Sequence, residues 1–163
     1  MTNEFEYCGE KFADLQILRY CVQGFEQLSL KQKLYIYYLA KATLCGRDIT
    51  TDQFGKYNLR IRKVLEAIYC NYSGNREDRN FEALVVYLKR VWFSNGIYHH
   101  YGCDKFQPGF SKESFIGMVD CISEKLLPLR DGETVEDLCK ELVPVIFDAD
   151  VIPMRVNKKE GED

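Results

Sequence analysis

The segment from Val91 to Phe110, which reads VWFSNGIYHHYGCDKFQPGF, is the part of this chain from which a fold and a function are best argued. It holds the only tryptophan, Trp92, both histidines, His99 and His100, five other aromatic residues and three glycines. Each glycine loses conformational freedom on folding, and packing of the aromatic rings must offset that loss. Long ordered loops on a rigid scaffold are often functional, so the segment is either a ligand-contact loop or an aromatic plug in the core.

Helical periodicity lies on both sides of this segment. Apolar residues recur at helical spacing over residues 10–23, 30–44, 57–72 and 81–92 before it, and over residues 112–122 after it. The expected N-terminal caps of these helices and of a short last one are Ser29, Asn80, Ser111 and Thr134, the last paired with Asp137 in a capping box. Asn95 and Gly96 are suited to a left-handed helix end.

The intervening stretches predict irregular structure. Residues 47–56 indicate a loop, and Pro144 is expected to end the last helix, which leaves residues 143–147 as a short strand or a buried extended segment. The polar residues 157–163 are expected to form a flexible tail. The sequence therefore predicts a predominantly α fold, with about six helices, little strand and a single helical domain over residues 1–163.

The charge balance argues against nucleic-acid binding. Lys and Arg number 22 against 25 Asp and Glu, which gives a net charge of −3. The one dense basic run, Lys56 to Lys63, is interpreted as a solvated helix face, since nucleic-acid binders concentrate basic charge on a surface. No run of 18 apolar residues is present, so we expect neither a membrane span nor, from the acidic N-terminus, a signal peptide.

The seven cysteines are widely spaced and contain no Cys-x-x-Cys pair. Four of them, Cys21, Cys45, Cys70 and Cys121, lie in or near apolar helical faces, where a free thiol behaves as a small buried hydrophobe. This pattern indicates reduced thiols in a reducing compartment, with a cytoplasmic location expected, rather than a disulfide framework.

Two kinds of chemistry are open to the aromatic segment. Cys103 and Asp104 are close enough in sequence to complete a small zinc site with His99 and His100, although a helical His-Glu-x-x-His motif is absent. Cys103 beside a histidine base is also the only nucleophile neighbourhood readable from the sequence. The alternative is that the imidazoles bond to the backbone and wall a cleft.

Several long blocks resemble the N-terminal region of bacterial dipeptidyl peptidase III enzymes. The most extensive is Glu82–Phe110, which includes VYLKRVWFSNG at residues 86–96, Tyr101-Gly102 and FQPGF at residues 106–110. FADLQILRY at residues 12–20, GRDI at 46–49 and GKYNLRIRK at 55–63 extend the resemblance over most of the chain.

The resemblance implies one lobe of a two-lobed zinc exopeptidase that removes dipeptides from peptide N-termini. In that family, zinc is held by a His-Glu-x-x-Gly-His motif and a later glutamate on the opposite lobe. Tyr101 matches a family position that lines the pocket for the N-terminal residues of the substrate. Asn95, Gly96 and Asp104 belong to the same matched loop, and we expect them to bind substrate.

The chain departs from the family because it has no His-Glu-x-x-Gly-His motif. We therefore expect a substrate-side portion of such an enzyme, inactive alone, with its zinc ligands, catalytic residues and the remainder of its polypeptide outside this chain. The alternative is a free-standing helical module that binds a peptide or a partner. Uncovered apolar faces near the aromatic segment and residues 143–147 predict self-association.

Overall fold

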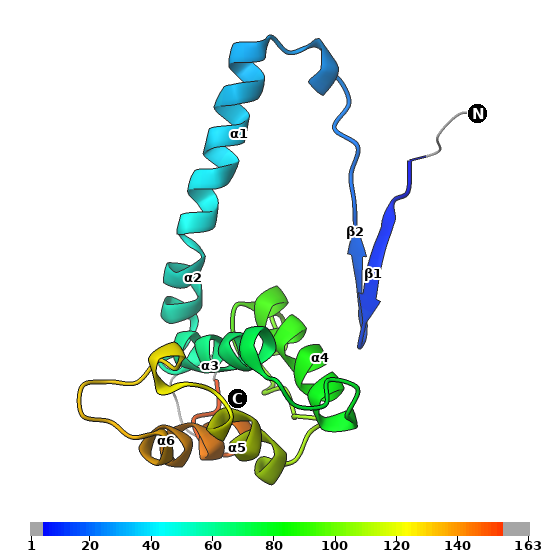
Figure 1. The fold of residues 1–163 in the computed structure, drawn as a ribbon. Coiled ribbons are helices and arrows are strands. Elements are labelled where there is room, and N and C mark those ends of the chain that lie inside the picture. The colour runs from blue at the N-terminus through cyan, green and yellow to red at the C-terminus, as the bar shows by residue number, and fades with distance from the viewer. Residues whose placement is uncertain (1–4, 155–163) are drawn as a thin grey trace. The chain divides into compact units, whose positions relative to one another are not determined.

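The structure, a computed structural model, describes residues 5–154 (Figure 1). Within that range it contains a two-stranded antiparallel sheet, six α-helices and two short 3-10 helices. These are β1 (Cys8–Phe12), β2 (Leu15–Leu18), η1 (Phe25–Gln27), α1 (Leu30–Cys45), α2 (Arg47–Phe54), α3 (Asn58–Asn71), α4 (Arg79–Ser94), α5 (Lys112–Asp120), η2 (Glu124–Leu126) and α6 (Val135–Phe147). The prediction of a predominantly α fold is confirmed. The expected tail over residues 157–163 lies outside the described residues.

The chain divides into two compact units, with the boundary between Asp48 and Ile49 inside α2. The sequence alone predicts a single helical domain over residues 1–163, without this division. The first unit contains β1, β2, η1 and α1, and the second contains α3 to α6 and the aromatic segment.

The first unit begins with a β-hairpin, so the helix predicted over residues 10–23 is wrong. β1 pairs with β2 in antiparallel register, with Phe12 opposite Leu15 and Lys11 opposite Gln16. The turn between the strands places Ala13 in the left-handed region at φ 49°. Half-buried and exposed residues alternate along β2, as the period of a strand requires. The apolar spacing of this stretch is compatible with a helix, but the two strands pair across the turn and form a hairpin instead.

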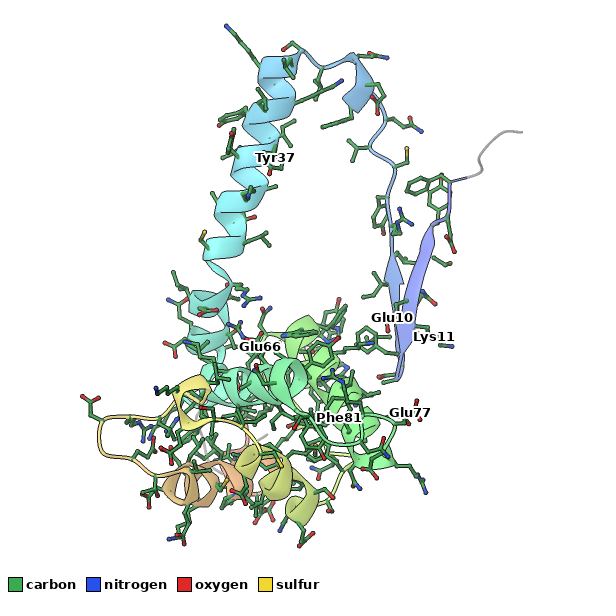
Figure 2. All side chains as sticks on the ribbon, viewed as in Figure 1. Glu10, Lys11, Tyr37, Glu66, Glu77 and Phe81 are labelled. Atoms are coloured by element: carbon green, nitrogen blue, oxygen red, sulfur yellow. The ribbon has the colours of Figure 1, made fainter. Side chains whose placement is uncertain are left out.

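Helix α1 follows the sequence prediction at its start. The Ser29 hydroxyl accepts a hydrogen bond from the Gln32 N–H, and the Gln32 side chain accepts one from the Ser29 N–H, which completes a capping box. None of the 16 residues of α1 is buried. Figure 2 labels Tyr37 on this helix, whose side chain is more than half exposed.

The second unit is built around a core from α3, α4, α5 and α6. Fully buried side chains include Ile61, Leu65, Leu88, Phe115 and Leu142, and Figure 2 labels Phe81, which is buried on α4. The amphipathic periodicity of α3 and α4 places one apolar face of each helix in this core. Burial therefore holds α4, in which the aromatic segment begins, against α3.

Three further local predictions are wrong. Residues 47–54 form α2 rather than a loop, and the buried Thr51 hydroxyl accepts a hydrogen bond of 2.7 Å from Arg62. Asp78, rather than Asn80, caps α4. Pro144 lies inside α6, which continues to Phe147. A helix tolerates proline there when tertiary packing outweighs the one lost hydrogen bond, and both Val145 and Ile146 are buried.

Two predictions about burial also require correction. Cys21, Cys45, Cys70 and Cys121 are exposed, and Cys139 is the buried cysteine; all seven thiols are free. The basic run from Lys56 to Lys63 is not a uniformly solvated face. Its Arg60 forms ion pairs with Glu133 and Glu141, and its Arg62 is buried. These interactions occupy both arginines within the second unit.

Among residues 5–154, no helix is both long enough and apolar enough to cross a membrane.

Candidate functional site: the aromatic loop

The aromatic loop, residues 97–106, forms a narrow hairpin-like structure after α4. Tyr98 and Lys105 form an isolated antiparallel bridge. The backbone N–H of Phe106 donates to the Ile97 carbonyl at 2.8 Å, and that of His99 donates to the Asp104 carbonyl at 2.7 Å. These bonds close the loop, so the turn of residues 100–104 is presented at its tip.

His99 organises this turn through its imidazole. Its Nδ1 accepts hydrogen bonds from the backbone N–H groups of Tyr101, at 3.2 Å, and Gly102, at 3.0 Å. An imidazole nitrogen that accepts carries no proton, so the proton of neutral His99 is on Nε2. The expectation that an imidazole in this segment bonds to the backbone is therefore met by His99, which has a structural role in the turn.

The rings at the tip pack against one another. The His99 and His100 rings are stacked with centroids 4.5 Å apart, and the Tyr101 ring lies 4.3 Å from that of His100. Phe93 meets His100 edge-on from the end of α4 at 5.0 Å. Tyr101 is nevertheless 85% exposed. One face of an aromatic cluster is thus available to a ligand while the cluster holds the ring in place.

The base of the loop is fixed to the core and to the segment after α6. Ile97, Tyr98 and Phe106 are buried. The Tyr98 hydroxyl donates to the Ile152 carbonyl at 2.6 Å, and the Lys105 ammonium donates to the carbonyl oxygens of Asp148 and Val151. Both partners of the bridge are thereby tied to residues 148–152.

The charge of Lys105 is set by this position. Burial lowers the pKa of Lys105, and the nearby Asp148 and Asp150 carboxylates act in the opposite direction. The two carbonyl oxygens that accept from the ammonium favour its charged form as well. Lys105 is therefore a cationic anchor of the loop base.

Asn58, at the start of α3, fixes the point where the loop leaves α4. Its side-chain Oδ1 accepts a hydrogen bond of 3.2 Å from the Ile97 N–H. A Cβ on Gly96 would collide with the Asn58 side chain, and a Cβ on Gly55 would lie 2.7 Å from Asn58 Nδ2. Glycine is needed at both positions because the buried Asn58 amide fills the space between them.

The four predicted site residues fall into two groups. Tyr101 and Asp104 lie on the exposed tip, where the Asp104 carboxylate is beside Gly102. Asn95 and Gly96 lie at the base. Asn95 ends α4 in the left-handed conformation at φ 56°, as predicted, and Gly96 is buried against Asn58. The geometry thus offers Tyr101 and Asp104 to a ligand and gives Asn95 and Gly96 a role in directing the chain.

Neither chemistry considered for this segment is assembled in the structure. Across residues 5–154, no group of three or more His, Cys, Asp or Glu side chains is arranged to hold a metal ion. In the same range, the Cys103 thiol makes no hydrogen bond to an imidazole, although Cys103 itself adopts a left-handed backbone at φ 60°.

Sequence reasoning missed the residues that anchor the loop, which are Asn58, Gly55 and Lys105. Gly55 and Asn58 are 39 or more residues from the loop, and no local signal connects them to it. Lys105 lies within the quoted segment, but the carbonyl oxygens that it binds come from residues after α6.

No protein-family model matches this chain, and no curated protein matches its sequence.

Proposed function

We propose that this chain is the N-terminal, substrate-side portion of a zinc-dependent dipeptidyl peptidase, which removes dipeptides from peptide N-termini. The proposal starts from the sequence resemblance over Glu82–Phe110 and the other matching blocks. The structural observation that supports it best is Tyr101, an exposed ring on a loop whose base is buried and hydrogen-bonded. A rigidly held aromatic ring binds a peptide with little loss of side-chain entropy.

The tip of the aromatic loop would contact the first residues of the peptide. The Tyr101 ring supplies apolar contact area, and the Asp104 carboxylate on the same turn supplies a negative charge for the α-ammonium group. The half-buried His100 ring, which stacks on His99 and meets the Tyr101 ring at a tilt, would extend this surface. Asn95 and Gly96 would act indirectly, because they set the direction in which the loop leaves α4.

The zinc chemistry of the proposed enzyme would belong to residues outside this chain. Zinc would acidify the attacking water and polarise the scissile carbonyl, and its ligands would come from a His-Glu-x-x-Gly-His motif that is absent here. The residues of this chain would bind and orient the peptide. Because the zinc site lies elsewhere, this chain would need the remainder of the polypeptide as its partner in the reaction. The proposed reaction involves neither nucleic acid nor a membrane. The free thiols favour a cytoplasmic location for the proposed enzyme.

The source gene provides the decisive test. A reading frame that continues past Asp163 to a His-Glu-x-x-Gly-His motif is the expected result, together with release of dipeptides by the protein that this frame encodes. A stop codon directly after Asp163 would contradict the proposal in this form.

A free-standing peptide-binding module is the second candidate. It is favoured by one observation, which is that the second unit contains its own buried core beneath the aromatic loop. This alternative predicts measurable heat when the chain is titrated with tetrapeptides and pentapeptides in a calorimeter, and loss of that heat in Tyr101→Ala. A panel of such peptides that produces no heat would count against it.

A further inference from the structure

The turn at the tip of the aromatic loop is closed by one titratable side chain. His99 Nδ1 accepts hydrogen bonds from the backbone N–H groups of Tyr101, at 3.2 Å, and Gly102, at 3.0 Å. Both donors converge on the nitrogen that binds a proton when this neutral imidazole becomes charged. An imidazolium carries an N–H at that position and leaves neither backbone group with an acceptor. Closure of the turn and protonation of His99 therefore oppose each other.

The groups packed around His99 add to the cost of a charged imidazole in the closed turn. His100 stacks on His99 with ring centroids 4.5 Å apart, and a second imidazolium there would repel the first. Phe106 meets His99 edge-on at 6.1 Å, and the Arg90 guanidinium of α4 lies 5.0 Å from the centroid of the Phe106 ring. A further cation in this cluster is disfavoured as long as the turn stays closed.

The Asp104 carboxylate offers a charged His99 an alternative partner. A Cβ on Gly102 would lie 3.0 Å from Asp104 Oδ2 and 3.6 Å from His99 Nδ1, so both atoms face the same small space. An Nδ1–H group can donate to a carboxylate, whereas a neutral Nδ1 that lacks a proton cannot. Two arrangements are therefore available, one with neutral His99 bonded to the backbone and one with charged His99 bonded to Asp104.

The other titratable groups of the loop and of the segment tied to its base serve that base. They are Tyr98, Tyr101, Cys103, Lys105, Asp148 and Asp150. The last two carboxylates act on Lys105, whose ammonium binds backbone carbonyl oxygens after α6. The Tyr98 hydroxyl donates to the Ile152 carbonyl. Asp104 is thus the carboxylate placed at the tip to pair with His99.

We propose that His99 is a pH-sensitive switch of the turn that presents Tyr101. Neutral His99 holds the turn closed, and protonation opens it and directs Nδ1–H to Asp104. Because the closed turn binds this proton less readily than the open one, acid shifts the balance toward the open turn. Imidazoles ordinarily gain their charge between about pH 8 and pH 5. A ligand that needs both the fixed Tyr101 ring and the free Asp104 charge is therefore held at neutral pH and released in acid.

Nuclear magnetic resonance of the whole chain tests the switch. Proton–nitrogen correlation spectra of the His99 imidazole should show an unprotonated Nδ1 at about pH 8 and a protonated one at about pH 5. Over the same transition, hydrogen-exchange protection of the Tyr101 and Gly102 N–H groups, corrected for the intrinsic rate at each pH, should fall about tenfold or more. The Phe106 N–H, bonded to the Ile97 carbonyl in the loop base, should keep its protection.

His99→Asn is the matched variant. An asparagine side-chain oxygen accepts from the backbone N–H two residues on, as in an Asx-turn, and does not titrate, so this variant should keep its protection at both pH values. His100→Asn removes the neighbouring imidazole instead and should retain the loss in acid. Asp104→Asn removes the alternative partner, so the loss should move to lower pH. If His99→Asn is unprotected at both pH values, the wild-type spectra decide, because protonation of Nδ1 and loss of protection must share one transition.

Four results would each overturn the proposal. They are a protonated Nδ1 at about pH 8, equal wild-type protection at both pH values, a loss in acid that persists in His99→Asn, and one that disappears in His100→Asn. An equal loss at Phe106 would also overturn it, since the whole loop would then be opening.

The switch itself does not depend on the proposed peptidase function, because the spectra report on the turn alone and dipeptide release is a separate measurement. The release of a peptide in acid rests on that proposed function.

Discussion

The aromatic loop and helix α1 both expose aromatic rings, and they do so in different ways. The loop buries Ile97, Tyr98 and Phe106 and exposes Tyr101 at its tip. Helix α1 exposes its tyrosines and leucines without burying any residue. An exposed ring on a buried base is suited to a small ligand that needs a rigid contact. An apolar helix without a buried face lacks the burial that such a helix normally has.

The largest expected difference between the two regions is in stability. Ile97→Ala removes a side chain with no exposed surface from the loop base and should lower the free energy of unfolding by about 2–5 kcal/mol. Leu34→Ala on α1 removes a comparable, partly exposed side chain and should change it by less than about 0.5 kcal/mol. Urea denaturation of both variants measures the difference. Equal losses would mean that α1 is buried in solution.

A substitution at Gly96, where the loop leaves α4, should have the next largest effect on stability. Gly96→Ala places a Cβ against the Asn58 side chain and should destabilise the second unit by about 1–3 kcal/mol. Gly117→Ala is the control, since a Cβ at this position in α5 meets no atom within 4 Å. It should stabilise the protein by about 0.5–1 kcal/mol, because alanine favours helix. Thermal unfolding of both variants should therefore give shifts of opposite sign.

Tyr87 lies beneath the end of the aromatic segment, with its ring 5.5 Å from that of Phe110. Its hydroxyl is buried and has no hydrogen-bond partner among the described residues. Tyr87→Phe should raise the free energy of unfolding by about 1 kcal/mol, because a buried unpaired hydroxyl is costly. A lower value in the variant would show that the hydroxyl has a bonding partner in solution.

The same residue predicts a dependence on pH. Burial raises the pKa of the Tyr87 hydroxyl, with a smaller contribution from Tyr98. Near pH 10 the unfolded chain releases this proton while the folded chain retains it, so the folded state loses stability as pH rises above about 10. Urea titrations at alkaline pH should show a smaller loss for Tyr87→Phe than for the wild type.

The tip of the loop should have the smallest effect on stability. Tyr101 is highly exposed, so Tyr101→Ala should change the free energy of unfolding by less than about 0.5 kcal/mol. Thermal unfolding measures this value. A loss as large as that for Ile97→Ala would show that Tyr101 is part of the base and not a ligand-contact residue.

The sequence predicted local features more accurately than contacts between distant residues. Ser29, Ser111 and Thr134 cap the helices that they were expected to cap, and Asn95 ends α4 in the left-handed conformation. These signals depend on a few neighbouring residues. The hairpin around Ala13, by contrast, depends on pairing across a turn, and its apolar spacing did not distinguish a strand from a helix.

The structure places the four predicted site residues in two different environments. Tyr101 and Asp104 are exposed at the tip, where a ligand can reach them, whereas Gly96 is buried against Asn58 and does not face a ligand. The anchors are Asn58 at the start of α3, Gly55 just before it, and Lys105, which binds the carbonyl oxygens of Asp148 and Val151. These contacts depend on how the helices pack. The exposure of Cys21, Cys45, Cys70 and Cys121 has the same origin, since helical spacing does not reveal which faces are covered.

The most direct test of the proposed function is the Michaelis constant for dipeptide release by the protein that the complete reading frame encodes. Tyr101→Ala should raise the KM for a short peptide about tenfold or more and leave the zinc content unchanged, because the ring contacts substrate and not metal. Tyr69→Ala, an exposed tyrosine on α3 outside the loop, should leave KM unchanged. An unchanged KM in Tyr101→Ala, or no dipeptide release by the wild-type protein, would contradict the account.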